Sequence, residues 1–336
     1  MNPRTPFQSA ARQKVSSTRA RFGRSLPDRE LSVQGPLLED ALPHYVLRDL
    51  VSTTGDLAVL PTTVVRLLDL LKDQTCAADK VVQVLDQDGA MTANVLKLSN
   101  SAFYGVRGTV ATTRQALVLL GNRSVLTLAF ATGMVPVMRR NLVGYGIDRD
   151  RYWEHSLTSA MAAGVAMERL GEPARACEAF TAGLVHDIGM LALDTHLANN
   201  AMKLVPAFPL FNVAEREQQA LGFDHTDAGA LLAENWGFPA ALAAAVAHHH
   251  HPWSAPVEED VVAAVMVGDM VAQMASDRLQ PEAWPEQLEY LAPRGIDRDY
   301  LRELVESVTH TPEETLARAT HPAGMPCPSS TRVSIS

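Results

Sequence analysis

Cysteine is scarce in this chain of 336 residues, which contains only Cys76, Cys177 and Cys327. Their odd number and wide separation exclude a disulfide framework and give no metal-ligand spacing, so we expect free thiols in a reducing compartment. Aromatic residues make up only 6% of the chain, against 47% hydrophobic residues overall. This balance disfavours a β-sandwich and favours helices packed on helices, so we predict an all-α fold.

Excess positive charge and long apolar runs are also lacking. The net charge of −9 and the pI near 5.7 would repel a phosphate backbone, so general nucleic-acid binding is not expected. The longest apolar candidate, Gln115 to Met138, is interrupted by Asn122 and Arg123, so no membrane span is predicted. The Arg-rich N-terminus has no apolar block behind it, unlike a secretory signal. We therefore expect a cytoplasmic protein.

The chain divides into a helical core between two polar tails. Residues 1–35 combine seven Arg and Lys residues with Ser, Gln and Pro, which predicts a disordered basic tail. The Pro/Ser-rich residues 321–336 predict a second disordered tail. Between them we expect a core over 50–280 and a C-terminal helical extension over 281–320. Glycines and charges at 142–150 favour a joint between an N-terminal lobe, about 50–145, and a C-terminal lobe, about 150–280.

Proline and glycine mark the expected helix ends. Pro61 stands at the start of an aliphatic helix, and Gly121 divides the apolar segment Arg114 to Met138. Gly171 closes a helix that begins near Tyr152, and a single helix is predicted over Ala174 to Leu193. No strand is predicted, and shorter helices are expected near 212–221, 226–236, 239–248 and 258–274.

Histidines and carboxylates in the second half form an ordered set on or at the ends of predicted helices. A helical bundle can direct such side chains inward to one point. His186 and Asp187 interrupt an apolar segment rich in small residues, and burying both without partners would cost several kcal/mol. Mixed His and carboxylate ligands suit Mn, Fe or Zn, and this many can hold one or two ions. The candidate ligands are His155, His186, Asp187, His225, members of the run from His248 to His251, and Asp269.

The segment from Gly183 to Gly189, Gly-Leu-Val-His-Asp-Ile-Gly, resembles the signature of the HD metal-phosphohydrolase superfamily. The ligand order of its HD-GYP branch is similar to a set of seven residues in this chain, which the resemblance implies as metal ligands: His155, His186, Asp187, His225, His249, His250 and Asp269. In the first half, Leu60-Pro61, Asp86 to Met91 and Leu98 to Gly105 with its Asn-Ser-Ala-Phe-Tyr-Gly sequence resemble the HDOD domain. The likeness covers about residues 50 to 280. It implies an all-α fold of two lobes, the second of HD type, and a role in bacterial signal transduction.

The chain departs from the HD-GYP pattern at three places. Met190 stands where a lysine follows His-Asp-Ile-Gly, and Arg151 stands where a bridging glutamate is expected. The segment His251-Pro252-Trp253 replaces the Gly-Tyr-Pro loop. Within the run from His248 to His251, the His-His-x-Pro register selects His249 and His250, and Pro252 ends the helix so that neighbouring histidines can face one site.

Two functions follow from the resemblance. HDOD proteins are generally regulatory or scaffolding modules, which predicts a protein that binds signalling partners and keeps an HD-type metal pocket. The alternative is an active metal-dependent phosphohydrolase acting on a nucleotide or cyclic dinucleotide, with His186 and Asp187 as candidate catalytic residues. Metal content and phosphodiesterase turnover separate the two.

Overall fold

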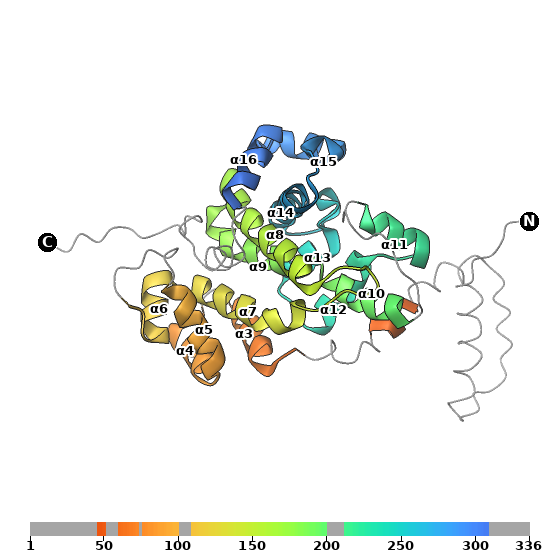
Figure 1. Cartoon of the computed structure of the whole chain (residues 1–336). Coiled ribbons are helices and arrows are strands. Elements are labelled where there is room, and N and C mark those ends of the chain that lie inside the picture. The colour runs from red at the N-terminus through yellow and green to blue at the C-terminus, as the bar shows by residue number, and fades with distance from the viewer. Residues whose placement is uncertain (1–45, 52–59, 74–75, 101–108, 200–211, 309–336) are drawn as a thin grey trace, which may run out of the picture.

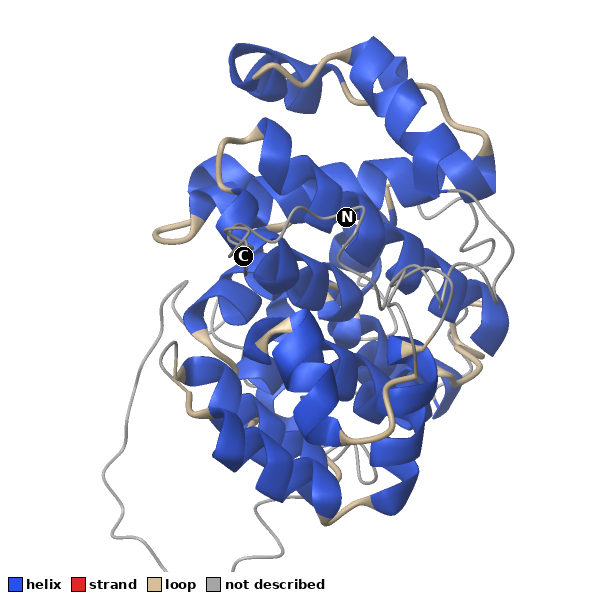
Figure 2. Ribbon diagram, turned by 90° about the vertical axis from the view of Figure 1, so that its left-hand side faces the viewer, coloured by secondary structure: helices blue, strands red, loops and turns tan. Residues whose placement is uncertain are grey.

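The computed structural model describes residues 46–51, 60–73, 76–100, 109–199 and 212–308, and these parts are helical (Figure 1). Figure 2 shows helices and loops throughout the described chain, and β-structure there is limited to an isolated antiparallel bridge between Leu142 and Ile147. The predicted all-α fold is confirmed. The two tails predicted to be disordered and the extension beyond residue 308 lie outside the described residues, as does the segment Ser101 to Gly105.

The first group of helices packs around α7, the longest of them. In each, apolar residues three or four apart face the group's interior, as in α3, where Val64, Leu67, Leu68 and Leu71 are buried. Within the group, α3 and α5 pack on α7, and α4 and α6 complete the bundle (Figure 1). The helices are α3 (Thr62–Lys72), α4 (Ala78–Asp86), α5 (Gly89–Ser99), α6 (Thr113–Leu120) and α7 (Asn122–Met138).

The predicted break at Gly121 is present between α6 and α7. Gly121 has φ of 81°, which residues with a Cβ rarely adopt, so the chain turns there without steric cost. Upstream, the Thr112 side chain accepts a hydrogen bond from the backbone N–H of Gln115 and caps α6.

The second group of helices is built on α8, α9 and α14, which pack closely at its centre (Figure 1). The close approach requires small residues: a Cβ on Gly268 of α14 would lie 2.3 Å from the carbonyl oxygen of Ser159 on α8. Backbones this near bring polar side chains of neighbouring helices within reach of one another. The helices are α8 (Arg149–Arg169), α9 (Ala176–Val185), α10 (Ile188–Asn199), α11 (Val213–Leu221), α12 (His225–Asn235), α13 (Ala240–His248) and α14 (Glu259–Asp277).

The single helix predicted over Ala174 to Leu193 is wrong, because the chain forms two helices with His186 and Asp187 at their junction. The His186 imidazole bonds the carbonyl oxygen of Gly183 through Nδ1, at 2.7 Å, and the N–H of Met190 donates to the carbonyl of Asp187 at 2.9 Å. These short-range bonds replace the regular helical ladder at the junction. The apolar stretches on both sides of this polar pair fit one helix equally well, so the pattern alone did not reveal the break.

The C-terminal helices α15 (Pro285–Leu291) and α16 (Arg298–Val308) lie beyond α14 (Figure 1). The amphipathic α16 packs against both α14 and α8 through Leu301, Leu304 and Val308.

Among the described residues, one segment, Pro173–Ala198, is long and apolar enough to cross a membrane by length and composition. In this fold 94% of its apolar window is buried inside the protein, which is how a core helix behaves.

Candidate metal centre

The structure brings all seven predicted ligands together inside the second helical group. His155 lies on α8, His186 and Asp187 at the junction of α9 and α10, and Asp269 on α14. His225 is the first residue of α12. His249 and His250 follow directly after His248, the last residue of α13, and precede a 3-10 helix over Pro252–Ser254. The His250 side chain is 26% exposed and the other six are buried, so the centre opens to solvent beside His250.

Glycine allows α10 and α12 to cross closely enough to join the two halves of this set. A Cβ on Gly189 would lie only 1.8 Å from the carbonyl oxygen of His225. The crossing therefore places His225 next to Asp187, two residues before Gly189.

The first half of the set is a group of His155, His186 and Asp187 whose candidate ligand atoms lie within 4.8 Å of one another. Nε2 of His155 lies 3.3 Å from Oδ2 of Asp187 and 3.3 Å from Oδ1 of Asp269. Nε2 of His186 lies 3.2 Å from the same Asp187 oxygen and 3.4 Å from Nε2 of His155. Two imidazoles and two carboxylates thus converge. We call His155, His186 and Asp187 the first triad, and Asp269 lies beside it.

The second half consists of His225, His249 and His250, whose ligand atoms also lie within 4.8 Å of one another. Nε2 of His225 lies 3.4 Å from that of His249 and 3.0 Å from that of His250. His225 and His249 approach Oδ1 of Asp187, at 3.4 and 3.5 Å. We call these three histidines the second triad. Asp187 therefore lies between the two groups: its Oδ2 faces His155 and His186, and its Oδ1 faces His225 and His249.

Hydrogen bonds behind the rings fix the tautomers of three histidines. The Nδ1 atoms of His186 and His249 lie 2.7 and 3.1 Å from the carbonyl oxygens of Gly183 and Ala245. Nδ1 of His225 lies 2.7 Å from a carboxylate oxygen of Glu217. A carbonyl or an ionised carboxylate can only accept, so each ring donates its Nδ1–H, and in the neutral ring Nε2 carries a lone pair directed at the centre.

Buried carboxylates make the centre attract positive charge. Burial alone lowers the pKa of His155, but hydrogen bonds to Asp187 and Asp269 outweigh it and raise that pKa to about 10. For His225, burial also lowers the pKa, and the adjoining Glu217 and Asp187 raise it to about 10. His250 behaves in the opposite way, because burial and its histidine neighbours hold its pKa well below the usual value.

The residues present fit a divalent metal. Lone pairs of neutral imidazoles that face each other and a carboxylate repel unless a cation lies among them. Donor atoms around a tetrahedral ion with bonds of about 2.1 Å are roughly 3.4 Å apart. This is close to the 3.2–3.5 Å that separate the oxygens of Asp187 from Nε2 of His155, His186, His225 and His249. Among the described residues Nδ1 of His155 is buried without a hydrogen-bond partner, and Nε2 of the same ring faces the carboxylates of Asp187 and Asp269.

Glu217, which was not among the predicted site residues, is fully buried on α11 behind the second triad. Its carboxylate accepts from both the backbone N–H and the ring of His225, and from the hydroxyl of Tyr145. A signal was available: Glu217 lies four residues from Val213 and four from Leu221, on the buried stripe of its helix. A carboxylate at such a position needs buried partners.

Arg151, in the position where HD-GYP proteins have a bridging glutamate, does not join the centre. Its guanidinium donates to Asp277, at 2.9 Å, near the C-terminal end of α14.

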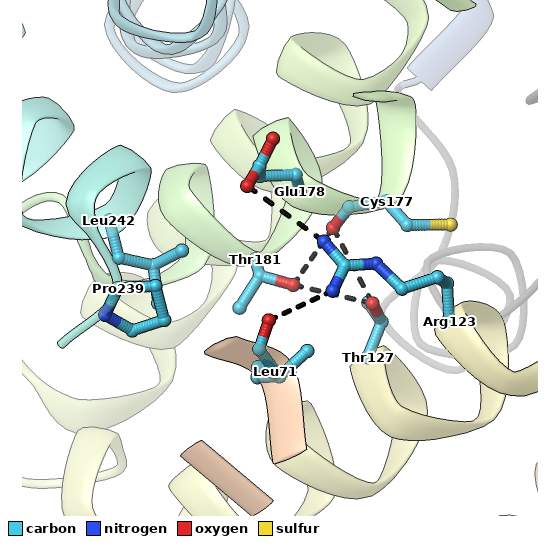
Figure 3. A pocket seen from close by; sticks show the side chains of 8 residues that line it. All are labelled: Leu71, Arg123, Thr127, Cys177, Glu178, Thr181, Pro239 and Leu242. Carbon is cyan, nitrogen blue, oxygen red and sulfur yellow. Dashed lines mark hydrogen bonds and ion pairs between the residues drawn. The ribbon is translucent and has the colours of Figure 1, made fainter. Parts of the chain in front are cut away.

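A separate pocket lies where α3 and α7 of the first group meet α9 and α13 of the second (Figure 3). Arg123 of α7 donates to the carbonyl of Leu71 at 2.9 Å and lies 3.8 Å from Glu178 of α9. The Thr181 hydroxyl bonds the carbonyl of Cys177 at 2.8 Å. Because its polar groups bond one another, we assign this pocket to the joining of the two helical groups. Its lining residues are Leu71, Arg123, Thr127, Cys177, Glu178, Thr181, Pro239 and Leu242.

Fold and centre together define an all-helical protein with a buried histidine and carboxylate cluster. The chain belongs to the HDOD domain family, whose model matches residues 57–252. This confirms the resemblance seen in the sequence.

Known relatives support this assignment. A proposed phosphohydrolase from Shewanella amazonensis SB2B is 26% identical, with a TM-score of 0.58 over 80% of this chain and 96% of that one. An HDOD domain protein of unknown function from Geobacter sulfurreducens shares the fold, at 21% identity and a TM-score of 0.61, over 82% and 96% of the two chains. An uncharacterized protein from Treponema pallidum is 22% identical over 69% of this chain, which spans 45% of that protein.

Proposed function

We propose that this chain is a signal-transduction protein that acts through partner binding and holds one or two divalent metal ions in its HD-type centre. The carrying observation is the convergence of imidazole Nε2 atoms from both triads on the two oxygens of Asp187. We also propose that the chain folds as two lobes, an N-terminal lobe over about 50–145 and an HD-type lobe over about 150–280. The metal is Fe, Mn or Zn, given the mixed nitrogen and oxygen donors.

Each ligand has a defined task in this proposal. His155, His186, Asp187 and Asp269 would hold one ion, and His225, His249 and His250, together with Asp187, would hold a second one if two are bound. The carbonyls of Gly183 and Ala245 keep the rings of His186 and His249 in the ligating tautomer. When bound, the ion supplies positive charge to a region that contains three buried carboxylates, those of Asp187, Glu217 and Asp269.

Two features favour binding over rapid turnover. The ligands are buried apart from the partly exposed His250, which narrows access to the centre. Position 151 is an arginine and so contributes no carboxylate to the centre, and its guanidinium pairs with Asp277. We place the protein in the cytoplasm, where its input comes from a partner or a ligand.

A second candidate function is metal-dependent phosphohydrolysis of a nucleotide or cyclic dinucleotide. The bridging geometry of Asp187 favours it, as does the likeness to the proposed phosphohydrolase from Shewanella amazonensis. When bound, the ion would supply Lewis acidity to a phosphoryl oxygen of the substrate. His186 and Asp187 would hold the ion in position.

Metal analysis and a phosphodiesterase assay test both functions. The purified protein is reconstituted with Mn²⁺, Fe²⁺ or Zn²⁺, its bound metal is measured, and cyclic dinucleotide hydrolysis is followed. We expect bound metal in the wild type and its loss in folded His186→Ala, with no turnover beyond background. Turnover that disappears in His186→Ala and Asp187→Ala would establish the hydrolase instead. A reconstituted wild type without metal would refute both.

A further inference from the structure

Glu217 joins the second triad to the turn that connects the two helical groups. This turn, residues 142–147, lies between α7 and α8 and is closed by the bridge of Leu142 and Ile147. Tyr145 of the turn is almost fully buried and donates its hydroxyl to Oε1 of Glu217. The other carboxylate oxygen, Oε2, accepts from the backbone N–H and from Nδ1–H of His225, each at 2.7 Å.

The turn is itself held firmly. The carboxylate of Asp194 on α10 accepts the backbone N–H of Gly144 at 2.6 Å. A Cβ on Gly144 would lie 2.5 Å from Cβ of Leu197, so the turn sits directly against α10. Tyr145 is therefore a fixed donor: burial first, and then the charge of Glu217, raise its pKa well above the usual value, so its hydroxyl stays protonated.

We propose that Glu217 is a positioning residue for the metal of the second triad, and that Tyr145 couples it to the turn between the helical groups. This rests on the proposed metal function. Glu217 accepts the Nδ1–H of the His225 ring and also the backbone N–H of the same residue. The ring bond opposes rotation of the imidazole and keeps its proton on Nδ1, while the backbone bond keeps the carboxylate in place. The carboxylate also raises the electron density on Nε2, which strengthens it as a ligand. In the part of the chain that the structure describes, no carboxylate takes this position behind the first triad: Nδ1 of His186 bonds a neutral carbonyl, and Nδ1 of His155 has no hydrogen-bond partner.

The experiment is Mn²⁺ titration of the full chain, followed by electron paramagnetic resonance. In Glu217→Gln we expect one bound ion to weaken by about 10- to 100-fold while the other keeps its affinity. In Tyr145→Phe, which removes one of three donors to the carboxylate, we expect a smaller loss of roughly three- to tenfold. The matched control is Glu215→Gln, an equal charge change on the exposed face of the same helix, which should leave both affinities unchanged.

The outcomes separate positioning from a structural role. Circular dichroism and the melting temperature of each metal-free variant report folding, and the Mn²⁺ dissociation constant of the folded protein reports positioning. If Glu217→Gln only lowers the melting temperature and keeps wild-type Mn²⁺ affinity, the inference is overturned. If Glu217→Gln does not fold, Tyr145→Phe decides by the same criterion. A wild type that binds no Mn²⁺ refutes the metal function and this inference together, whereas an unaffected Glu217→Gln refutes the inference alone.

Discussion

Replacing Gly189 with alanine should damage the stability of the protein and its second triad together. The new Cβ would lie 1.8 Å from the carbonyl oxygen of His225 and 2.6 Å from the backbone nitrogen of Gly229. Ordinary contact begins near 3.4 Å, so the two backbones would have to separate by about 1.6 Å. The clash is between backbones and no side-chain rotation relieves it, so we expect a loss of about 3 kcal/mol or more in the free energy of unfolding.

The same displacement acts on metal binding. Nε2 of His225 and Oδ1 of Asp187 are 3.4 Å apart, and moving α12 by about half that distance would separate two ligands of one ion. Urea denaturation measures the stability, and Mn²⁺ titration of the folded fraction measures the binding. We expect the variant to lose the ion of the second triad first.

Gly89→Ala provides the matched control. Gly89 is exposed at the start of α5, and a Cβ there would meet nothing within 4 Å. Alanine should leave stability unchanged or raise it by about 0.5–1 kcal/mol, since it reduces the freedom of the unfolded chain. Equal urea midpoints for Gly189→Ala and the wild type would refute the reasoning, because α10 and α12 could then not be in the contact described.

Three further predictions follow from the structure. Thr112→Ala removes the cap of α6 and should cost about 1 kcal/mol in urea denaturation; an unchanged midpoint would contradict the cap. Phe130→Ala removes a fully buried ring that packs edge-on against Phe238, at 6.5 Å between centroids, and should cost about 3–5 kcal/mol. A cost near zero would show that this contact between the helical groups is absent. Metal at 100 times its dissociation constant should raise the free energy of unfolding of the wild type by about 2.7 kcal/mol, and a chelator should reverse this stabilisation. Asp187→Asn should abolish the stabilisation by metal. An equal stabilisation of that variant would show that Asp187 is not a ligand.

Local signals in the sequence account for the all-α architecture and most helix ends. Pro61 precedes α3, Gly121 separates α6 from α7, and Gly171 follows α8 with φ of 84°. Each acts through its own backbone, by a fixed φ, a missing donor or an accessible positive φ, and so is visible in sequence. The seven candidate ligands were also named from the sequence. Burial of His186 and Asp187 among apolar residues demands partners, and the resemblance to the HD-GYP ligand order supplied the other five.

Contacts between distant segments were not visible in this way. The break at His186 and Asp187 depends on a bond from the His186 ring to the backbone, which the apolar stretches on either side do not reveal. Glu217 has partners far from it in sequence, Tyr145 at 72 positions upstream and His225 at 8 positions downstream. The sharing of Asp187 between two triads requires α8, α9, α12 and α13 to meet at one point. Sequence spacing specifies which face of a helix a side chain occupies, whereas the approach of two helices depends on the packing of both surfaces at once.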